Sequence, residues 1–85
     1  MKKHTKAQTM KRFREMILSE YPHLKYAGTW KVEGITHLIF TTTNGDELEL
    51  EEEIASKLNK VILETGYFFL AGVDAESEVI KLRAR

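Results

Sequence analysis

The sequence contains no cysteine, a single proline and no long apolar run. Without cysteine the chain forms neither disulfides nor thiolate metal sites, which fits a reducing compartment. No stretch approaches the ~20 apolar residues that a membrane-spanning helix needs, and the basic N-terminus lacks the apolar core of a signal peptide. We therefore expect a cytoplasmic protein that does not bind or cross a membrane.

Motifs for catalysis, metal binding and cofactor binding are also lacking. The three histidines are scattered, and the five glycines do not form a phosphate-binding loop. The acidic residues between positions 46 and 53 lack the Asp, Asn and Gly spacing of a calcium loop. The threonines at positions 41–43 have no base beside them that would activate a nucleophile. The sequence therefore predicts a protein that is not an enzyme and uses no cofactor or metal.

The length of 85 residues, with 42% hydrophobic and 31% charged residues, predicts one small domain. Its charges cancel overall but are segregated along the chain. Residues 1–31 hold eight Lys or Arg and two Glu, whereas residues 32–56 hold seven acidic residues and no Lys or Arg. Either these regions attract each other across the fold, or one of them docks an oppositely charged partner. Residues 1–4 are expected to form a flexible basic arm.

The N-terminal segment predicts an amphipathic helix. Thr5 and Gln8 match a capping box, in which each side chain accepts a hydrogen bond from the other residue's backbone N–H. Pro22 ends the helix, because proline disfavours the helical conformation in the residue before it. The apolar stripe of this helix recurs at helical spacing and consists of Met10, Phe13, Ile17 and Tyr21.

The segment from Tyr26 to Leu50 predicts three antiparallel strands joined by two tight turns. Asn44-Gly45 is the preferred pair for a two-residue turn of type I′, whose central residues both need a positive φ. In the other turn, Glu33-Gly34, only the glycine adopts a positive φ without strain.

Two-residue turns fix the register, because side chains alternate between the two faces of a strand. Trp30 then faces His37, and Thr41 faces Leu48. One face is predicted to be the core and to lie under both helices; it carries Tyr26, Gly28, Trp30, Val32, Ile35, His37, Ile39, Thr41, Leu48 and Leu50. The other face is polar apart from an apolar island. That island consists of Leu38, Phe40 and Ala27. We expect the C-terminal hairpin, a second copy of the chain or another partner to cover Leu38 and Phe40.

After Leu50 the apolar residues recur at helical spacing, and a second helix is predicted from Glu51 to Thr65. Acidic residues fill its first turn, where they favour the helix dipole, and Gly66 suits its C-terminal end. Tyr67 to Val73 predicts a buried strand, and residues 78–84 alternate as the second strand of a hairpin. The predicted order is α-β-β-β-α-β-β, an α+β domain with an antiparallel sheet and both helices on one face.

The first five predicted elements resemble, in their order, the double-stranded RNA-binding domain. That family contacts RNA phosphates through a lysine cluster at the start of its second helix. Here the same position holds Glu51, Glu52 and Glu53, which repel phosphates. The resemblance therefore implies a similar topology and no RNA-binding residues.

Two kinds of function fit these observations. The first is a small non-enzymatic interaction or regulatory module, such as a phage or mobile-element inhibitor, that binds a protein partner or forms a homodimer. It would use its sheet face or the acidic region of residues 32–56. The candidate residues are Leu38, Phe40, Lys31, Glu47, Glu49 and Glu52. The alternative is a nonspecific nucleic-acid-binding protein that uses its basic arm and first helix. Its candidate contacts are Lys2, Lys3, Lys6, Lys11, Arg12 and Arg14.

Overall fold

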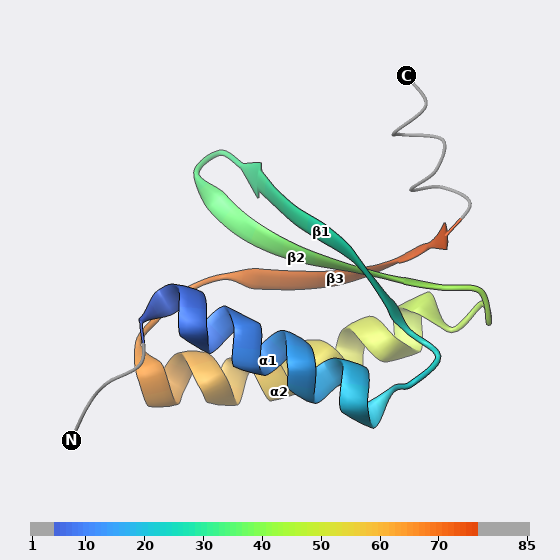
Figure 1. Ribbon diagram of the computed structural model, residues 1–85, viewed down its shortest axis with the longest axis horizontal. Coiled ribbons are helices and arrows are strands. Elements are labelled where there is room, and N and C mark those ends of the chain that lie inside the picture. The colour runs from blue at the N-terminus through green and yellow to red at the C-terminus, as the bar shows by residue number, and fades with distance from the viewer. Residues whose placement is uncertain (1–4, 77–85) are drawn as a thin grey trace.

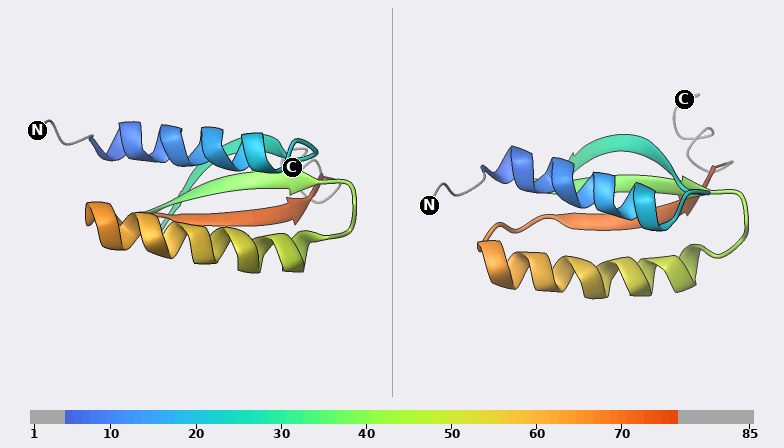
Figure 2. Two further views of the ribbon diagram at one scale, coloured as in Figure 1. Left: turned by 90° about the horizontal axis from the view of Figure 1, so that it is seen from below. Right: turned by 60° about the horizontal axis from the view of Figure 1, so that its bottom comes forward.

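The computed structural model describes residues 5–76, which form two helices packed on a three-stranded sheet (Figure 1). The elements in chain order are α1 (Lys6–Glu20), β1 (Lys25–Val32), β2 (Ile35–Thr42), α2 (Glu47–Thr65) and β3 (Leu70–Ala75). Both helices lie against the same face of the sheet, and no described element covers the other face (Figure 2). The predicted arm at residues 1–4 and the predicted strand at residues 78–84 lie outside the described residues.

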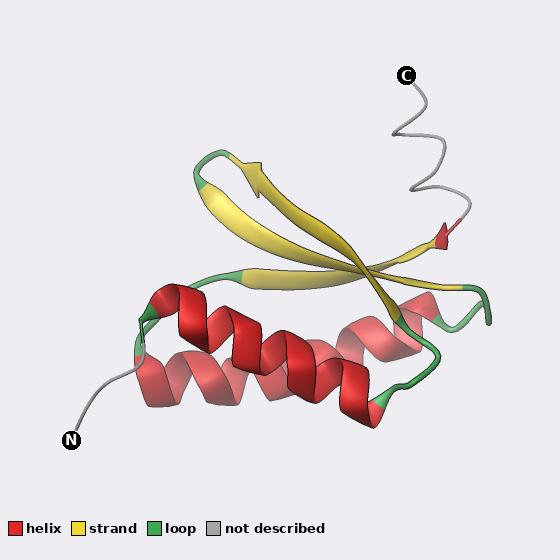
Figure 3. Ribbon diagram, in the orientation of Figure 1, coloured by secondary structure: helices red, strands yellow, loops and turns green. Residues whose placement is uncertain are grey.

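The α+β class is confirmed, but the prediction of a purely antiparallel sheet is wrong. The strand order is β1-β2-β3, in which β1 is antiparallel and β3 parallel to the central strand β2. A parallel neighbour requires a long crossover connection, which α2 supplies (Figure 3). The observed order α-β-β-α-β therefore lacks the third antiparallel strand of the double-stranded RNA-binding domain.

The error begins at Asn44-Gly45, which connects β2 to a helix and does not reverse a strand. The Thr42 hydroxyl accepts a hydrogen bond from the Asn44 N–H at 3.2 Å and donates one to the Asp46 carboxylate at 2.8 Å. This arrangement leads the chain directly into α2, which begins four residues earlier than predicted. Leu48, predicted to lie on a strand opposite Thr41, is therefore an exposed helix residue.

Both predicted ends of the first helix and the predicted C-terminal end of the second helix are confirmed. Thr5 and Gln8 form the capping box, with hydrogen bonds of 2.9 and 3.1 Å. The helix α1 ends at Glu20, shortly before Pro22. At the end of α2, Gly66 adopts the left-handed conformation with φ of 77°, and its N–H donates to the Ile62 carbonyl.

The predicted register of the first hairpin is also confirmed. Glu33 and Gly34 both have positive φ, 53° and 81°, as a type I′ turn requires. Trp30 pairs with His37 on the neighbouring strand as expected. A bulge between Tyr26 and Gly28 then shifts the register, so that the start of β1 changes faces.

The helices cover the face opposite to the predicted one. Leu38 and Phe40 are 2% and 0% exposed, so the island assigned to an interface is the centre of the core. Trp30 is only half-buried and lies with Val32, 52% exposed, on the uncovered face. Ile39 is buried as predicted but does not belong to the core cluster, whose members are Phe13, Ile17, Leu24, Leu38, Phe40, Leu50, Ile54, Leu58, Phe69 and Val73.

Phe40 is expected to be the most sensitive position of the core. Its ring is fully buried and packs against Tyr26 with ring centroids 5.6 Å apart. The substitution Phe40→Ala should lower the free energy of unfolding by ~3–5 kcal/mol, because it removes buried contacts and leaves a cavity. Urea denaturation would measure this loss, with Leu63→Ala, at an 86% exposed position, as the control. A loss below about 1 kcal/mol for Phe40→Ala would contradict the assignment of the buried face.

Candidate functional site

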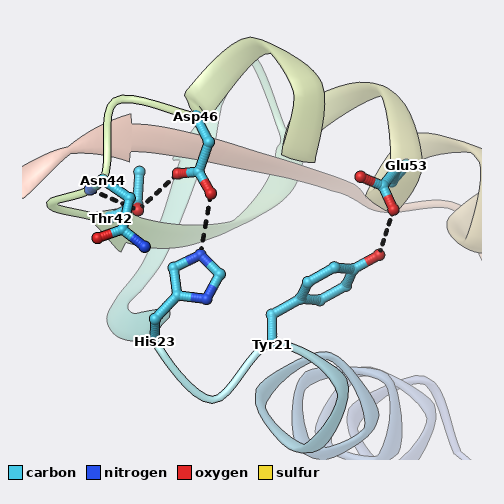
Figure 4. Close-up of polar contacts among 6 residues, drawn as sticks. All are labelled: Tyr21, His23, Thr42, Asn44, Asp46 and Glu53. Atoms are coloured by element: carbon cyan, nitrogen blue, oxygen red, sulfur yellow. Dashed lines mark hydrogen bonds and ion pairs between the residues drawn. The ribbon is translucent and has the colours of Figure 1, made fainter.

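Three polar contacts join α1 and the loop after it to α2; those of Tyr21 and His23 are drawn in Figure 4. The Lys57 ammonium lies 2.9 Å from the Glu20 carboxylate. The Tyr21 hydroxyl donates to Glu53 at 3.0 Å, and burial together with this hydrogen bond raises the pKa of the phenol above 10.0. The third contact, between the loop and the start of α2, involves Asp46. These contacts join the two helices to each other on one side of the sheet.

Asp46 connects the start of α2 to the end of β2, which directly precedes it, and to the loop before β1, which is distant in the sequence. One carboxylate oxygen accepts the hydrogen bond from Thr42 at the end of β2, and the other lies 3.0 Å from His23 Nε2 in the loop before β1. The hydrogen bond from Thr42 is the main cause that lowers the pKa of Asp46 below its ordinary 3.8. Desolvation opposes this shift, and the contact with His23 adds to it. The geometry is that of a structural junction, since the carboxylate is already bound on both sides.

This junction predicts a pH dependence of stability. A carboxylate whose pKa is lowered by folding stabilises the protein fully above the unfolded pKa, here 3.8, and this stabilisation is lost as the pH falls through the lower folded pKa. Asp46→Asn keeps the shape but removes the charge. The wild-type protein should therefore be more stable than this variant at pH 7, and the difference should shrink below pH 3.8. Urea denaturation between pH 7 and about pH 2.5 checks this; a difference independent of pH would contradict it.

The two edges of the sheet differ in their surroundings. At the outer edge of β3, Glu51 of α2 accepts a hydrogen bond from the Val73 N–H at 3.3 Å. The same carboxylate lies close to the neighbouring backbone, because a Cβ added at Gly72 would be 3.3 Å from its oxygen. At the outer edge of β1, Thr29 and Lys31 are exposed. Within residues 5–76, a side chain of α2 therefore binds a backbone donor at the β3 edge, whereas exposed residues line part of the β1 edge.

The uncovered face of the sheet carries an apolar surface near the first hairpin. One row of paired residues crosses all three strands, from Trp30 through His37 to Leu70. Val32 and Ile35, which pair with each other beside the turn, extend this surface. We call these five residues the open face. They are half-buried, except for the more exposed Val32, and none carries a full charge when the imidazole is neutral.

A groove of about 580 Å³ separates the two helices on the other side of the molecule. It is lined by Thr9, Arg12, Phe13, Met16, Val61, Glu64 and Thr65. Its floor is apolar and its rim carries charges of both signs. Among the described residues, no group of three or more His, Asp or Glu side chains is placed to bind a metal ion.

The structure separates the residues predicted to form the protein interface. Leu38 and Phe40 are buried, which excludes them from any surface of the folded chain. Lys31 is exposed on β1, whereas Glu49 and Glu52 are exposed and Glu47 is half-buried on α2, which packs along the opposite edge of the sheet.

The sequence-based prediction missed the open face, because its residues were assigned to the core. One signal was present in the sequence. The run Leu38-Ile39-Phe40 is apolar on both faces of the strand, which is typical of a central strand. It does not, however, indicate which face the helices cover.

The residues predicted to contact nucleic acid lie in different surroundings. Lys2 and Lys3 fall outside the described residues. Lys6, Lys11 and Arg12 are exposed on α1. The Arg14 guanidinium, in contrast, lies 4.9 Å from the ring centroid of Tyr26, so its charge is held at the sheet by a cation–π contact.

The comparisons with known proteins leave the function to be inferred from this geometry. No protein-family model matches the chain, and comparisons with curated proteins and with solved structures give no match. Neither helix in residues 5–76 has the length and apolar character needed to cross a bilayer.

Proposed function

We propose that the protein is a small, non-enzymatic interaction module that binds another protein through the first hairpin. The observation that carries this proposal is the open face, a surface without Lys, Arg, Asp or Glu that has an exposed Val32 and a tryptophan at its edge. Burying such apolar side chains stabilises a complex by ~25 cal/mol per Å² of apolar surface before the costs of association are subtracted. The hairpin therefore offers a docking surface that does not require the helices to move.

The composition of the open face favours a protein partner. Tryptophan is enriched among residues whose removal most weakens protein complexes. Nucleic acids need positive charge at the contact, and none of the five residues is a lysine or arginine. A module of this kind acts by occupying a partner's surface, which suits a cytoplasmic regulator or inhibitor.

Substitution of Trp30 tests the proposal. Tagged wild-type protein, Trp30→Ser and the matched control Leu63→Ser would be used to capture proteins from a lysate of the native cells. We expect wild type and control to retain the same proteins, and Trp30→Ser to lose them at least about tenfold, a typical effect of removing an aromatic anchor. Thermal unfolding would show that all three fold. Equal capture by all three, or loss with the control alone, would contradict the proposal.

Nucleic-acid binding by α1 is the second candidate, and the exposed Lys6, Lys11 and Arg12 favour it. Glu64 lies in the same groove as Arg12, however, and weakens the positive potential there.

We expect no gel shift of double- or single-stranded DNA or RNA at physiological salt. Sub-micromolar binding that disappears when all three bases become Gln would instead establish the alternative. In that case each single substitution should also flatten the salt dependence of binding, because one fewer phosphate is neutralised.

A further inference from the structure

We infer that the outer edge of β1 is a strand-addition site for an extended segment that alternates acidic and apolar residues. This inference rests on the proposed function and names the kind of protein segment that docks at the hairpin. In strand addition, an extended chain forms backbone hydrogen bonds with an accessible sheet edge, and its alternate side chains provide the specificity.

The turn geometry determines which backbone groups point outwards. Around a two-residue turn, the flanking residues Val32 and Ile35 form a pair that exchanges both backbone hydrogen bonds. Hydrogen-bonded and non-hydrogen-bonded pairs then alternate, so Trp30 is bonded inwards to β2. The N–H and C=O groups of Thr29 and Lys31 consequently point away from the sheet, and both residues are exposed.

The accessible stretch is short and well defined. The bulge between Tyr26 and Gly28 interrupts the regular edge on one side, and the turn at Glu33 ends it on the other. The remaining stretch, residues 28–32, offers two outward-pointing residues to an added strand. A bulge of this kind limits unspecific pairing at an edge, which favours a segment of defined length.

The charge at this edge determines the chemistry of the partner. β1 contains Lys25 and Lys31 and no acidic residue. Lys25 is paired with Glu76 at 3.4 Å, while Arg14 lies against the same strand over Tyr26. Lys31 pairs with Thr36, so its side chain lies on the helix-covered side of the sheet, and Trp30 lies on the opposite side. A strand added beside residues 28–32 therefore meets the Lys31 ammonium on one side and the open face on the other.

The same charge argues against a second copy of the chain as the occupant. Pairing β1 with β1 of another copy would bring the Lys31 side chains of both copies to one edge. Like charges close together across strands are destabilising. A segment with acidic residues on one side and apolar residues on the other avoids this repulsion and contacts both sides of the edge favourably.

Hydrogen exchange of individual amides tests the inference on the full chain. The probes are two capped hexapeptides, one alternating Glu with Val and the other alternating Lys with Val. We expect the acidic peptide to slow the exchange of the Thr29 and Lys31 amides at least about tenfold, because it covers groups that are open to solvent. The Trp30 amide is the internal control, since it is bonded to β2 with or without peptide. The basic peptide should have no effect.

A charge reversal completes the test. Lys31→Glu should transfer the protection to the basic peptide, whereas Lys60→Glu, at an exposed position of α2, should leave the preference for the acidic peptide unchanged. Equal protection by both peptides, no protection by either, or an unchanged preference in Lys31→Glu would overturn the inference. Concentration-dependent protection without peptide would show that a second copy occupies the edge, which would also overturn it.

The results also separate this inference from the proposed function. If neither peptide protects the edge but Trp30→Ser still loses its captured partners, the interaction module stands and strand addition is wrong. If the acidic peptide binds but Trp30→Ser captures the same proteins as wild type, the edge binds acidic strands and the open face is not the docking surface.

Discussion

Burial of one side of β2 against both helices is the interaction on which the other features depend. Phe40 and Leu38 lie at the centre of the core, with Phe13 of α1 and Ile54 of α2 among the side chains around them. Both helices pack on this side of the sheet, and no element in residues 5–76 covers the opposite side. The position of the open face is therefore a consequence of packing on the far side of the same strand.

Local features could be predicted from the sequence because their causes lie within a few residues. The capping box at Thr5, the left-handed end at Gly66 and the register of the first hairpin each depend on one turn of chain. The choice of the sheet face that the helices cover does not depend on any single turn of the chain. It depends on β3 pairing in parallel with β2, which brings Val73 and the preceding Phe69 into the core with Leu38. The two strands are about 30 residues apart in the sequence.

The same distinction explains why the candidate site was missed. Asn44-Gly45 has the composition of a hairpin turn, but the side chain of Thr42 bonds Asn44 and Asp46 and leads the chain into a helix. Such side-chain hydrogen bonds compete locally with strand pairing, and the composition of the turn does not show which of the two forms. Without a third antiparallel strand, the predicted core face becomes the exposed one, although the pairing of Trp30 with His37 is unchanged.

The carboxylate of Glu51 at the edge of β3 has a consequence for assembly. A sheet with two accessible edges can add strands at both, and identical chains can then grow into a fibre without limit. In this sheet the Glu51 carboxylate of α2 already accepts the hydrogen bond of the Val73 N–H, so a strand added beside β3 would have to displace this contact. The loss of this hydrogen bond disfavours strand addition at β3, and with it the growth of a fibre from both edges of the sheet.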